Sequence, residues 1–271
     1  MISRFRFNIL IYESFLNIFK IFFYKNKKEK DHEKNLKNEL SKIYKNSSFY
    51  FFDHGRTAFY ETLLQIKKKT NKRKILVNSL TLFEIINVII YAGFEPVFVD
   101  NKKNSFETEI TLNNININLN EIAVIVVTHL NGANPNILNL KIQVSEYNKK
   151  NDKIYLVEDC AVALGAKIDN DNVGLFGDYS FISFNIMKNI TSYTGGVLID
   201  NIKEISNADL QNYRKSSKID IFKKIVFVFI IQLVNTKILF PIFLKIVNLS
   251  YKYSFNFFLK KYRTDFQIKI E

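Results

Sequence analysis

The feature that most constrains the fold of this chain is the alternation of short apolar runs with stretches of helical periodicity. Residues 122–127 are apolar almost without interruption, as in a strand that is covered on both faces. Strands are also expected over 74–78 and 97–99, on either side of a helix over 82–92 that ends at Gly93. Strand–helix–strand alternation predicts a parallel sheet with helices on its faces, and therefore an α/β fold.

The rest of the chain adds further elements of both kinds. The hydrophobic spacing predicts helices over 31–44, 58–67 and 137–149, and strands over 49–52, 154–157, 179–184 and 197–199. Residues 101–120 are polar and irregular, which predicts a connection. Residues 1–30 mix apolar and charged side chains. We therefore expect an amphipathic segment that crosses the domain surface, not a signal peptide or a membrane-spanning helix.

The composition limits the cellular compartment and the classes of ligand that are expected. With 39 basic and 26 acidic residues, the chain carries a formal charge of +13, which would suit nucleic acid or an anionic membrane surface. The lysines are spread over runs such as 25–30 and 67–69, so a solvated surface is the simpler interpretation and no nucleic-acid partner is expected. The one cysteine, Cys160, excludes an internal disulfide and is expected as a packed core thiol of a cytoplasmic protein. Three scattered histidines predict no metal site.

Lys188 stands in an unusual setting. It follows the strand predicted over 179–184 and precedes a Gly-Gly pair, Gly195 and Gly196, that opens the next apolar run. A lysine in a short loop between two buried strands lies close to the core, where burial lowers its pKa and suits it to form a Schiff base. The alternative is a surface lysine in a tight turn.

Asp159 supplies the second half of a candidate site. It ends the apolar run at 154–157, and an acid at the carboxyl end of a parallel strand faces the crevice in which α/β proteins bind ligands. A lysine and an acid so placed are the two groups that pyridoxal 5'-phosphate (PLP) requires. The lysine holds the aldehyde, and the acid pairs with the pyridine nitrogen.

Six motifs in order along the chain carry a resemblance to a known family. They are GRTAFY at 55–60, NVIIYAGFEPVFVD at 87–100, VVTHLNG at 126–132, EDCAVALG at 158–165, GLFGD at 174–178 and SFNIMK at 183–188. With these stretches the sequence resembles the DegT/DnrJ/StrS family of PLP-dependent sugar aminotransferases. The resemblance reaches from Gly55 to about Asp200, which is most of the family's large domain.

The resemblance implies a fold-type I PLP-enzyme domain over residues 1–218, with a mostly parallel seven-stranded sheet flanked by helices. It implies a cytoplasmic homodimer that transfers an amino group from an amino acid to a keto nucleotide-sugar in cell-surface polysaccharide biosynthesis, with glutamate as the expected donor. Lys188 and Asp159 would be the catalytic residues. In a related branch, the sugar dehydratases, the lysine is replaced, so Lys188 argues against that reaction.

The resemblance also assigns residues to the cofactor. Gly55, Arg56 and Thr57 form a glycine turn that opens a helix, and free N–H groups there favour an anion such as the cofactor phosphate. Ser183 would add a hydroxyl to the phosphate. The alternatives are an ordinary helix N-terminus and a common turn serine. His129 is expected near the cofactor as a hydrogen-bonded histidine, not as the catalytic base.

Two positions depart from the family pattern. Many members have an aromatic residue that stacks on the cofactor where this chain has Leu82, and here the aromatic comes one place later, at Phe83. Either Leu82 makes an apolar contact with the cofactor instead of stacking, or a shifted loop lets Phe83 stack on it. The alternative for Phe83 is ordinary packing in the core. Val162 stands where relatives often have Gln or His, and valine cannot make their hydrogen bond to the cofactor.

Residues 219–271 break the pattern. Two apolar blocks, 221–234 and 238–247, predict packed or interfacial helices with a break near Pro241, since neither block reaches the ~20 residues of a spanning helix. Residues 219–258 are basic as well as apolar and predict a peripheral contact with an anionic inner membrane face. An insertion packed on the protein or a partner subunit is the alternative.

The family's smaller C-terminal domain is expected to be missing from this sequence. Three readings therefore stay open at this point: an active aminotransferase, a truncated or degenerate homologue that serves as a binding or regulatory module, and a membrane-surface protein.

Overall fold

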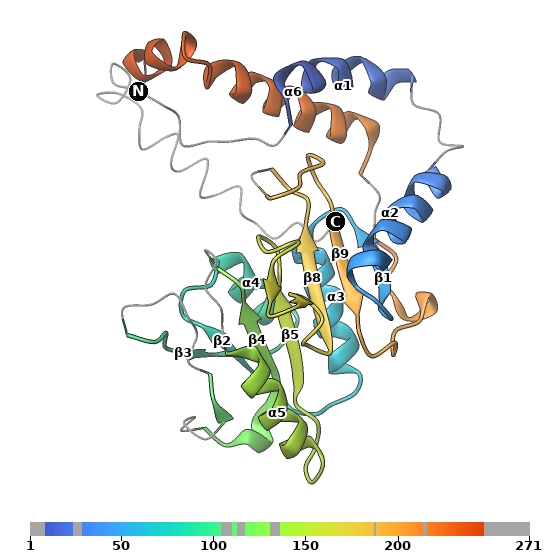
Figure 1. Ribbon diagram of the computed structural model, residues 1–271, viewed down its shortest axis with the longest axis vertical. Coiled ribbons are helices and arrows are strands. Elements are labelled where there is room, and N and C mark those ends of the chain that lie inside the picture. The colour runs from blue at the N-terminus through green and yellow to red at the C-terminus, as the bar shows by residue number, and fades with distance from the viewer. Residues whose placement is uncertain are drawn as a thin grey trace.

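The computed structural model describes residues 9–23, 29–103, 110–112, 117–130, 136–186, 188–213 and 216–246 (Figure 1). Its centre is a seven-stranded sheet in the order β1-β9-β8-β5-β4-β2-β3. The strands are β1 (Ser48–Phe52), β2 (Lys74–Asn78), β3 (Glu95–Val99), β4 (Ile122–Thr128), β5 (Tyr155–Asp159), β8 (Tyr179–Ser183) and β9 (Gly196–Asp200). Only β9 runs antiparallel to its neighbours in this sheet. The predicted mostly parallel, seven-stranded α/β fold is thus confirmed.

Helices cover both faces of the sheet. Helices α2 (Glu29–Ile43) and α5 (Ile137–Asn148) lie on one face, and α3 (Gly55–Lys67) and α4 (Phe83–Tyr91) on the other. The remaining short elements are the 3-10 turns Leu119–Glu121 and Asn207–Asp209 and the hairpin of β6 (Lys167–Ile168) with β7 (Asp171–Asn172). Elements of both faces bury apolar side chains against the sheet, which is the arrangement that doubly covered parallel strands require.

Strand β4 shows why the sequence folds in this way. All seven of its residues are buried. Ile125 and Val127 belong to the core on the α2 and α5 face, whereas Val124 and Val126 belong to the core on the α3 and α4 face. Because both faces are covered, the strand reads as a continuous apolar run, not as an alternation of apolar and polar residues.

The first described helix and α6 pair with each other outside the sheet. Helix α1 (Ile11–Phe23) packs along α6 (Lys218–Val234), as Figure 1 shows in blue and orange. A further helix, Leu239–Ile246, follows at a bend of 97°. Within the described residues no single helix is long and apolar enough to cross a membrane, whereas α6 and this last helix together meet the length and composition criteria as a bent pair.

The break between the C-terminal helices falls at residues 235–238, before the predicted position at Pro241. Pro241 instead lies in the first turn of the last helix, where a missing backbone N–H costs no intrahelical hydrogen bond. Much of the connection predicted over 101–120 lies outside the described residues, as do residues 247–271.

Candidate functional site

The carboxyl ends of three neighbouring strands meet where the sequence placed the site. Thr128 at the end of β4 is in register with Asp159 at the end of β5, and Asp159 is in register with Phe181 of β8. The His129 backbone N–H donates to the Asp159 carbonyl at 3.1 Å. These contacts fix the acid at the edge of the sheet at which open α/β folds bind ligands.

Asp159 is almost completely buried at 5% exposure. One carboxylate oxygen accepts the Ala161 backbone N–H at 3.0 Å. Burial raises the pKa of the carboxyl group, and the Ala161 N–H, Lys188 and His129 partly offset that rise. An acid in this setting needs a nearby positive group to stay ionised.

Lys188 lies in the loop after β8 and is half-buried. Burial lowers the pKa of its ammonium group, while Asp159 and then Glu84 act in the opposite direction. Lys188 and Asp159 thus lie close enough to act on each other electrostatically. Its lowered pKa increases the neutral, nucleophilic fraction at neutral pH.

Glu84 is a site residue that the sequence reasoning missed. It lies in the first turn of α4, and its Oε2 atom is buried without a hydrogen bond among the described residues. Its carboxylate acts electrostatically on Lys188. The available signal was its place two residues after Leu82, at the same helix N-terminus as the predicted cofactor contacts.

The N-terminus of α3 forms a narrow cradle against the end of β8. A Cβ atom at Gly55 would lie 2.9 Å from the Ser183 Cβ and 3.3 Å from its Oγ, so only glycine allows this approach. The Oγ1 atom of Thr57 is buried there without a hydrogen bond among the described residues. Arg56 lies between Gly55 and Thr57 in the first turn of α3. An orphaned hydroxyl beside a helix N-terminus and a serine fits an anionic group such as a phosphate.

The Gly-Gly pair holds the other side of this turn. A Cβ atom at Gly196 would lie 2.3 Å from the backbone carbon of His54, which precedes α3. Lys224 of α6 reaches the same point, with its Nζ atom 3.4 Å from the His54 Nε2 and 3.1 Å from the Thr194 Oγ1. Burial first, and Lys224 and Arg56 next, lower the pKa of His54 to about 4, although Asp53 acts in the opposite direction. His54 is therefore neutral at pH 7.

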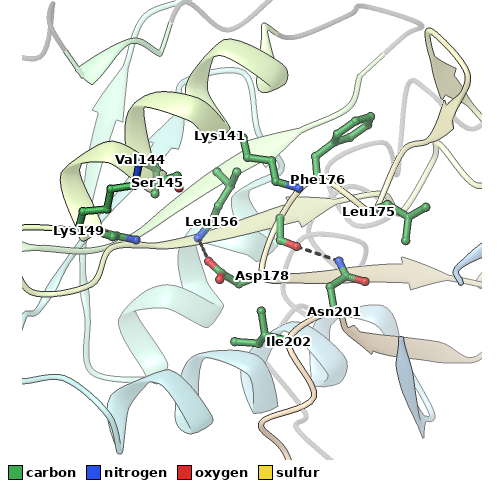
Figure 2. Close-up of a pocket in the computed structure, with 12 residues that line it drawn as sticks. Lys141, Val144, Ser145, Lys149, Leu156, Leu175, Phe176, Asp178, Asn201 and Ile202 are labelled. Carbon is green, nitrogen blue, oxygen red and sulfur yellow. Dashed lines mark hydrogen bonds between the residues drawn. The ribbon is translucent and has the colours of Figure 1, made fainter. Parts of the chain in front are cut away.

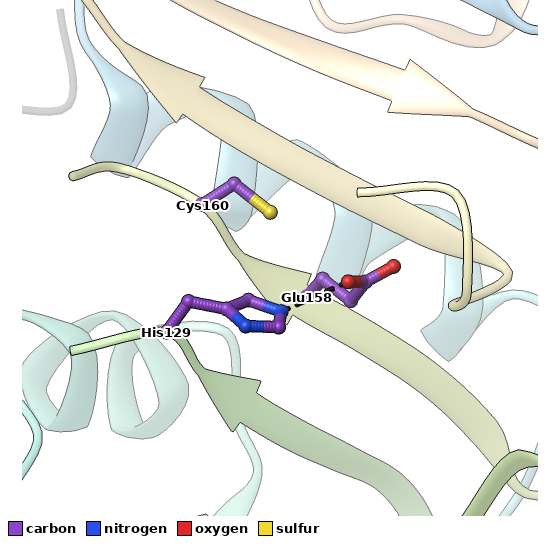
Figure 3. Close-up of side chains that lie close together, drawn as sticks. All are labelled: His129, Glu158 and Cys160. Atoms are coloured by element: carbon purple, nitrogen blue, oxygen red, sulfur yellow. Dashed lines mark hydrogen bonds and ion pairs between the residues drawn. The ribbon is translucent and has the colours of Figure 1, made fainter. Parts of the chain in front are cut away.

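A buried cluster of His129, Glu158 and Cys160 lies at the carboxyl ends of β4 and β5 (Figure 3). The Glu158 carboxylate accepts backbone N–H groups from Gly174 at 2.9 Å and from Phe176 and Gly177 at 2.7 Å each. The His129 ring nitrogen Nε2 lies 2.9 Å from the Glu158 Oε2. His129 is thus the buried, hydrogen-bonded histidine that the sequence predicted.

The same cluster is the group of metal-ligating residue types found in the described part of the chain, and it consists of His129, Glu158 and Cys160. The Glu158 oxygens already accept four hydrogen bonds. Burial also raises the pKa of the Cys160 thiol well above its ordinary value, and the neutral thiol is a poor ligand. We interpret the cluster as structural, since it ties the 174–177 loop to β5.

A comparison with family models matches residues 32–217 to the DegT/DnrJ/EryC1/StrS aminotransferase family. This match covers more than half of the chain. The chain belongs to this family. The predicted family and its fold-type I domain are thereby confirmed.

Individual relatives agree with the family match. The chain is 33% identical over 132 residues to the GDP-perosamine synthase of Vibrio cholerae. This alignment covers 49% of this chain and 34% of the relative. It is 30% identical over 145 residues to a UDP-4-amino-4,6-dideoxy-N-acetyl-beta-L-altrosamine transaminase of Campylobacter jejuni, covering 53% of this chain and 36% of the relative. The chain therefore spans about a third of the length of these relatives.

Solved structures show the same fold at low identity. PseC of Helicobacter pylori, an aminotransferase involved in the biosynthesis of pseudoaminic acid, superposes with a TM-score of 0.62 at 18% identity, over 83% of this chain and 55% of PseC. A GDP-4-keto-6-deoxymannose-3-dehydratase superposes with a TM-score of 0.56 at 18% identity, over 75% of this chain and 52% of that one. A sugar aminotransferase from Streptococcus pneumoniae was solved in its PLP-form.

The two positions that depart from the family pattern lie open to solvent. Leu82 caps the N-terminus of α4 and is 54% exposed, Phe83 follows it at 52%, and Val162 is 36% exposed. Exposure of this size is not that of core packing, which was the alternative reading for Phe83. Both side chains at the start of α4 are accessible to a ligand at this edge of the sheet.

A separate pocket of about 480 Å³ lies at the other end of the strands (Figure 2). Leu156 near the start of β5 and Asp178 just before β8 line it, together with Lys141 of α5 and Lys149 directly after that helix. Asp178 already accepts the Leu156 N–H at 2.8 Å. Since Asp159 lies at the opposite end of β5, this pocket belongs to the scaffold and not to the candidate site.

Proposed function

We propose that this chain is the cofactor-binding part of a PLP-dependent sugar aminotransferase. The amino group would pass from an amino acid, glutamate in our proposal, to a keto nucleotide-sugar for cell-surface polysaccharide biosynthesis. The observation that carries the proposal is the pairing of Lys188 with Asp159 at the carboxyl edge of the sheet. Burial lowers the pKa of Lys188 and raises the pKa of Asp159, and the charge of each side chain partly offsets the shift of the other. The two side chains therefore stabilise each other's charged forms.

The residues of the site fit the parts of the cofactor. Gly55, Arg56 and Thr57 at the α3 N-terminus, together with Ser183, would hold its phosphate, since N–H groups and orphaned hydroxyls gather there. Asp159 would face the ring nitrogen. When bound, PLP supplies an electron sink for chemistry at the α-carbon of an amino acid.

The chain's own residues would hold the cofactor in place and transfer protons. The Lys188 amine would hold the cofactor and, once released, move a proton to or from the donor's α-carbon. Glu84 lies close enough to act electrostatically on this amine and would help to keep it near the reacting atoms. The buried Asp159 carboxylate would keep a proton on the ring nitrogen. A positioned base of this kind contributes roughly 10²–10⁴-fold to the rate.

A second function, that of a non-catalytic binding module, draws support from Leu82 and Val162, which depart from the family pattern at exposed positions near the site. Sugar dehydration draws support from one structural neighbour, and Lys188 speaks against it. We favour transamination because the lysine and the acid are both present and are electrostatically coupled.

Assembly and location are also part of the proposal. We propose a cytoplasmic homodimer with each site near the subunit interface, as in the family. The division into a domain over 1–218 and an extension over 219–271 stays a prediction. The peripheral membrane contact predicted for residues 219–258 also stays a prediction, and residues 247–258 lie outside the described part of the chain.

The test is a visible absorption spectrum of the purified chain with PLP, before and after borohydride. We expect an absorption band that borohydride removes, and a pyridoxyl mass on the peptide that contains Lys188. A matched Lys188→Ala variant should show neither. A folded chain without band or mass would exclude the aminotransferase proposal, and a label on a different lysine would exclude the role given to Lys188.

A further inference from the structure

Helix α1 buries polar side chains and exposes apolar ones to the solvent. Its serine, Ser14, is fully buried, and its asparagine, Asn17, donates to the Tyr193 hydroxyl at 3.1 Å. Its aromatic residues lie outside instead, with Phe22 68% and Phe23 82% exposed. A surface helix of a water-facing protein shows the opposite distribution, with polar residues outward and apolar residues inward.

The apolar surface continues from α1 onto the two C-terminal helices. We call this surface the helix-pair face. Its large exposed apolar residues are Leu10, Ile11, Tyr12, Phe15, Leu16, Phe19, Phe22 and Phe23 on or beside α1, Ile219, Phe227 and Ile230 on α6, and Ile238, Leu239, Ile242, Phe243 and Ile246 after it. Apolar patches of this extent mark a site of interaction with a protein or a membrane.

Among the described residues of these helices and of the turn between the last two, the charged side chains that are exposed are all lysines. Lys20, Lys218, Lys223, Lys237 and Lys245 are exposed. The two acids of the same helices are engaged in helix caps, since Glu13 accepts the Leu10 N–H at 2.9 Å and Asp220 accepts the Ser217 hydroxyl at 2.6 Å. A protein face with apolar residues at its centre and lysines around them complements the surface of an anionic lipid bilayer. In such a bilayer the acyl chains are apolar and the headgroups above them are negatively charged.

The inner side of α6 shows that the face is one-sided. Ile225 and Val228 are buried against Tyr193, and the Gln232 side chain donates to the Ile9 carbonyl at 2.6 Å. The helix pair is therefore anchored to the protein along one side and presents its apolar residues on the other. This arrangement suits helices that lie in the plane of an interface, not helices that span it.

We propose that the helix-pair face docks on the surface of an anionic lipid bilayer, with the α1 phenylalanines inserted at the boundary between headgroups and acyl chains. The lysines would lie at the level of the lipid headgroups, where each contributes about fivefold to the binding constant. This inference rests on the polarity of α1 and α6, and it is independent of the proposed chemistry at Lys188.

The chain contains no tryptophan, so a Phe22→Trp variant of the full chain carries a single reporter. With phosphatidylglycerol vesicles that contain brominated acyl chains, we expect a blue shift and strong quenching. The matched control is Phe98→Trp on β3, where the native side chain is 55% exposed, and we expect neither change there. An unchanged Phe22→Trp spectrum, or equal quenching at both positions, would overturn the proposal.

A second experiment tests the charges by vesicle flotation. The triple variant Lys20→Glu, Lys223→Glu, Lys237→Glu should bind phosphatidylglycerol vesicles on the order of a hundredfold more weakly. The control Lys34→Glu, Lys37→Glu, Lys150→Glu carries the same net charge and should retain most of the binding. Equal losses in both variants would mean attraction by net charge alone. If the chain instead self-associates through Phe22 and Phe23 and ignores vesicles, the face is a subunit interface and the lipid proposal is wrong.

Discussion

The Tyr193 hydroxyl donates to the Ser14 Oγ at 3.2 Å and so joins the loop after Lys188 to the first described helix of the chain. Tyr193 has a positive φ of 68°, which is rare for a bulky residue and costs of order 1–3 kcal/mol. The side chain is nevertheless almost fully buried between α1 and α6. The packing of this one ring therefore offsets the backbone strain, and the helix pair holds the lysine loop in place.

A Tyr193→Phe variant tests that connection. The ring still packs, but Ser14 and Asn17 lose their shared partner in a buried place, so we expect a loss of about 1–2 kcal/mol in the free energy of unfolding. Urea unfolding measures it. The control is Tyr147→Phe, whose hydroxyl donates to Asn120 at 2.8 Å in an exposed place and should cost less than half as much. Equal effects of the two variants would contradict a special role for Tyr193.

The low pKa of His54 makes stability depend on pH. Its folded pKa of about 4 lies below the ordinary 6.5, so the unfolded chain binds more protons between these values. Stability from this group should therefore be complete above pH 6.5 and fall as the pH drops towards 4, by up to about 3 kcal/mol. A His54→Gln variant should flatten the curve of unfolding free energy in that window, and a curve like that of the wild type would refute the prediction.

The charge of Lys224 is one of the effects that lower the pKa of His54. A Lys224→Met variant removes a positive charge 3.4 Å from the His54 ring, so the pKa of His54 should rise, as followed by the ring proton resonance in an NMR titration. The matched control is Lys223→Met, at the next position of α6 but exposed to solvent. We expect little change there. A pKa that falls, or that moves equally in both variants, would show that Lys224 does not act on His54.

Glu158 should be among the most sensitive residues for stability. A Glu158→Gln variant would turn an amide donor towards backbone N–H groups that now donate to the carboxylate, in a fully buried place. We expect a loss of roughly 3 kcal/mol or more, measured by urea unfolding. Glu146→Gln, on the exposed side of α5, should stay within about 0.5 kcal/mol of the wild type. Since we interpret the cluster as metal-free, a chelator should not change the melting temperature of the wild type.

Asp159→Asn separates folding from chemistry. The amide oxygen can still accept the Ala161 N–H, so the stability should not fall. If Asp159 faces the cofactor nitrogen, the half-reaction of the PLP-loaded chain with glutamate should slow by at least about a hundredfold. Stopped-flow absorbance measures this rate, and Asp171→Asn on the exposed β7 turn is the control. A variant with an unchanged rate would remove Asp159 from the proposed site.

Local sequence signals predicted the scaffold well. The strands around Val126 and Val157 were readable because a strand covered on both faces leaves a continuous apolar run, and Gly93 marked the end of a helix because its φ of +80° favours glycine. Lys188 and Asp159 could be paired because parallel strands bring their carboxyl ends to one edge of the sheet.

Contacts between distant residues were out of reach. Nothing local indicates that Lys224 reaches His54, 170 residues away in sequence, or that Ser14 meets Tyr193. Glu84 was overlooked because a glutamate in a first helical turn is ordinary at that place. The bend before Pro241 was misplaced because proline is tolerated in the first turn of a helix, so it marks a helix start as readily as a break.

The edge strand β1 has a consequence for how this protein emerges from the ribosome. Among the described strands it pairs only with β9, and this pairing joins Ser48 to Asp200 and Phe52 to Gly196. At 5–20 residues per second, the ribosome needs about 8 to 30 s to make the intervening chain. For that time the nascent segment SFYFF, with four aromatic residues, has no strand to pair with. We therefore expect this segment to be a principal binding site for chaperones during synthesis, and expression at lower temperature or with added chaperone to raise the yield of folded protein.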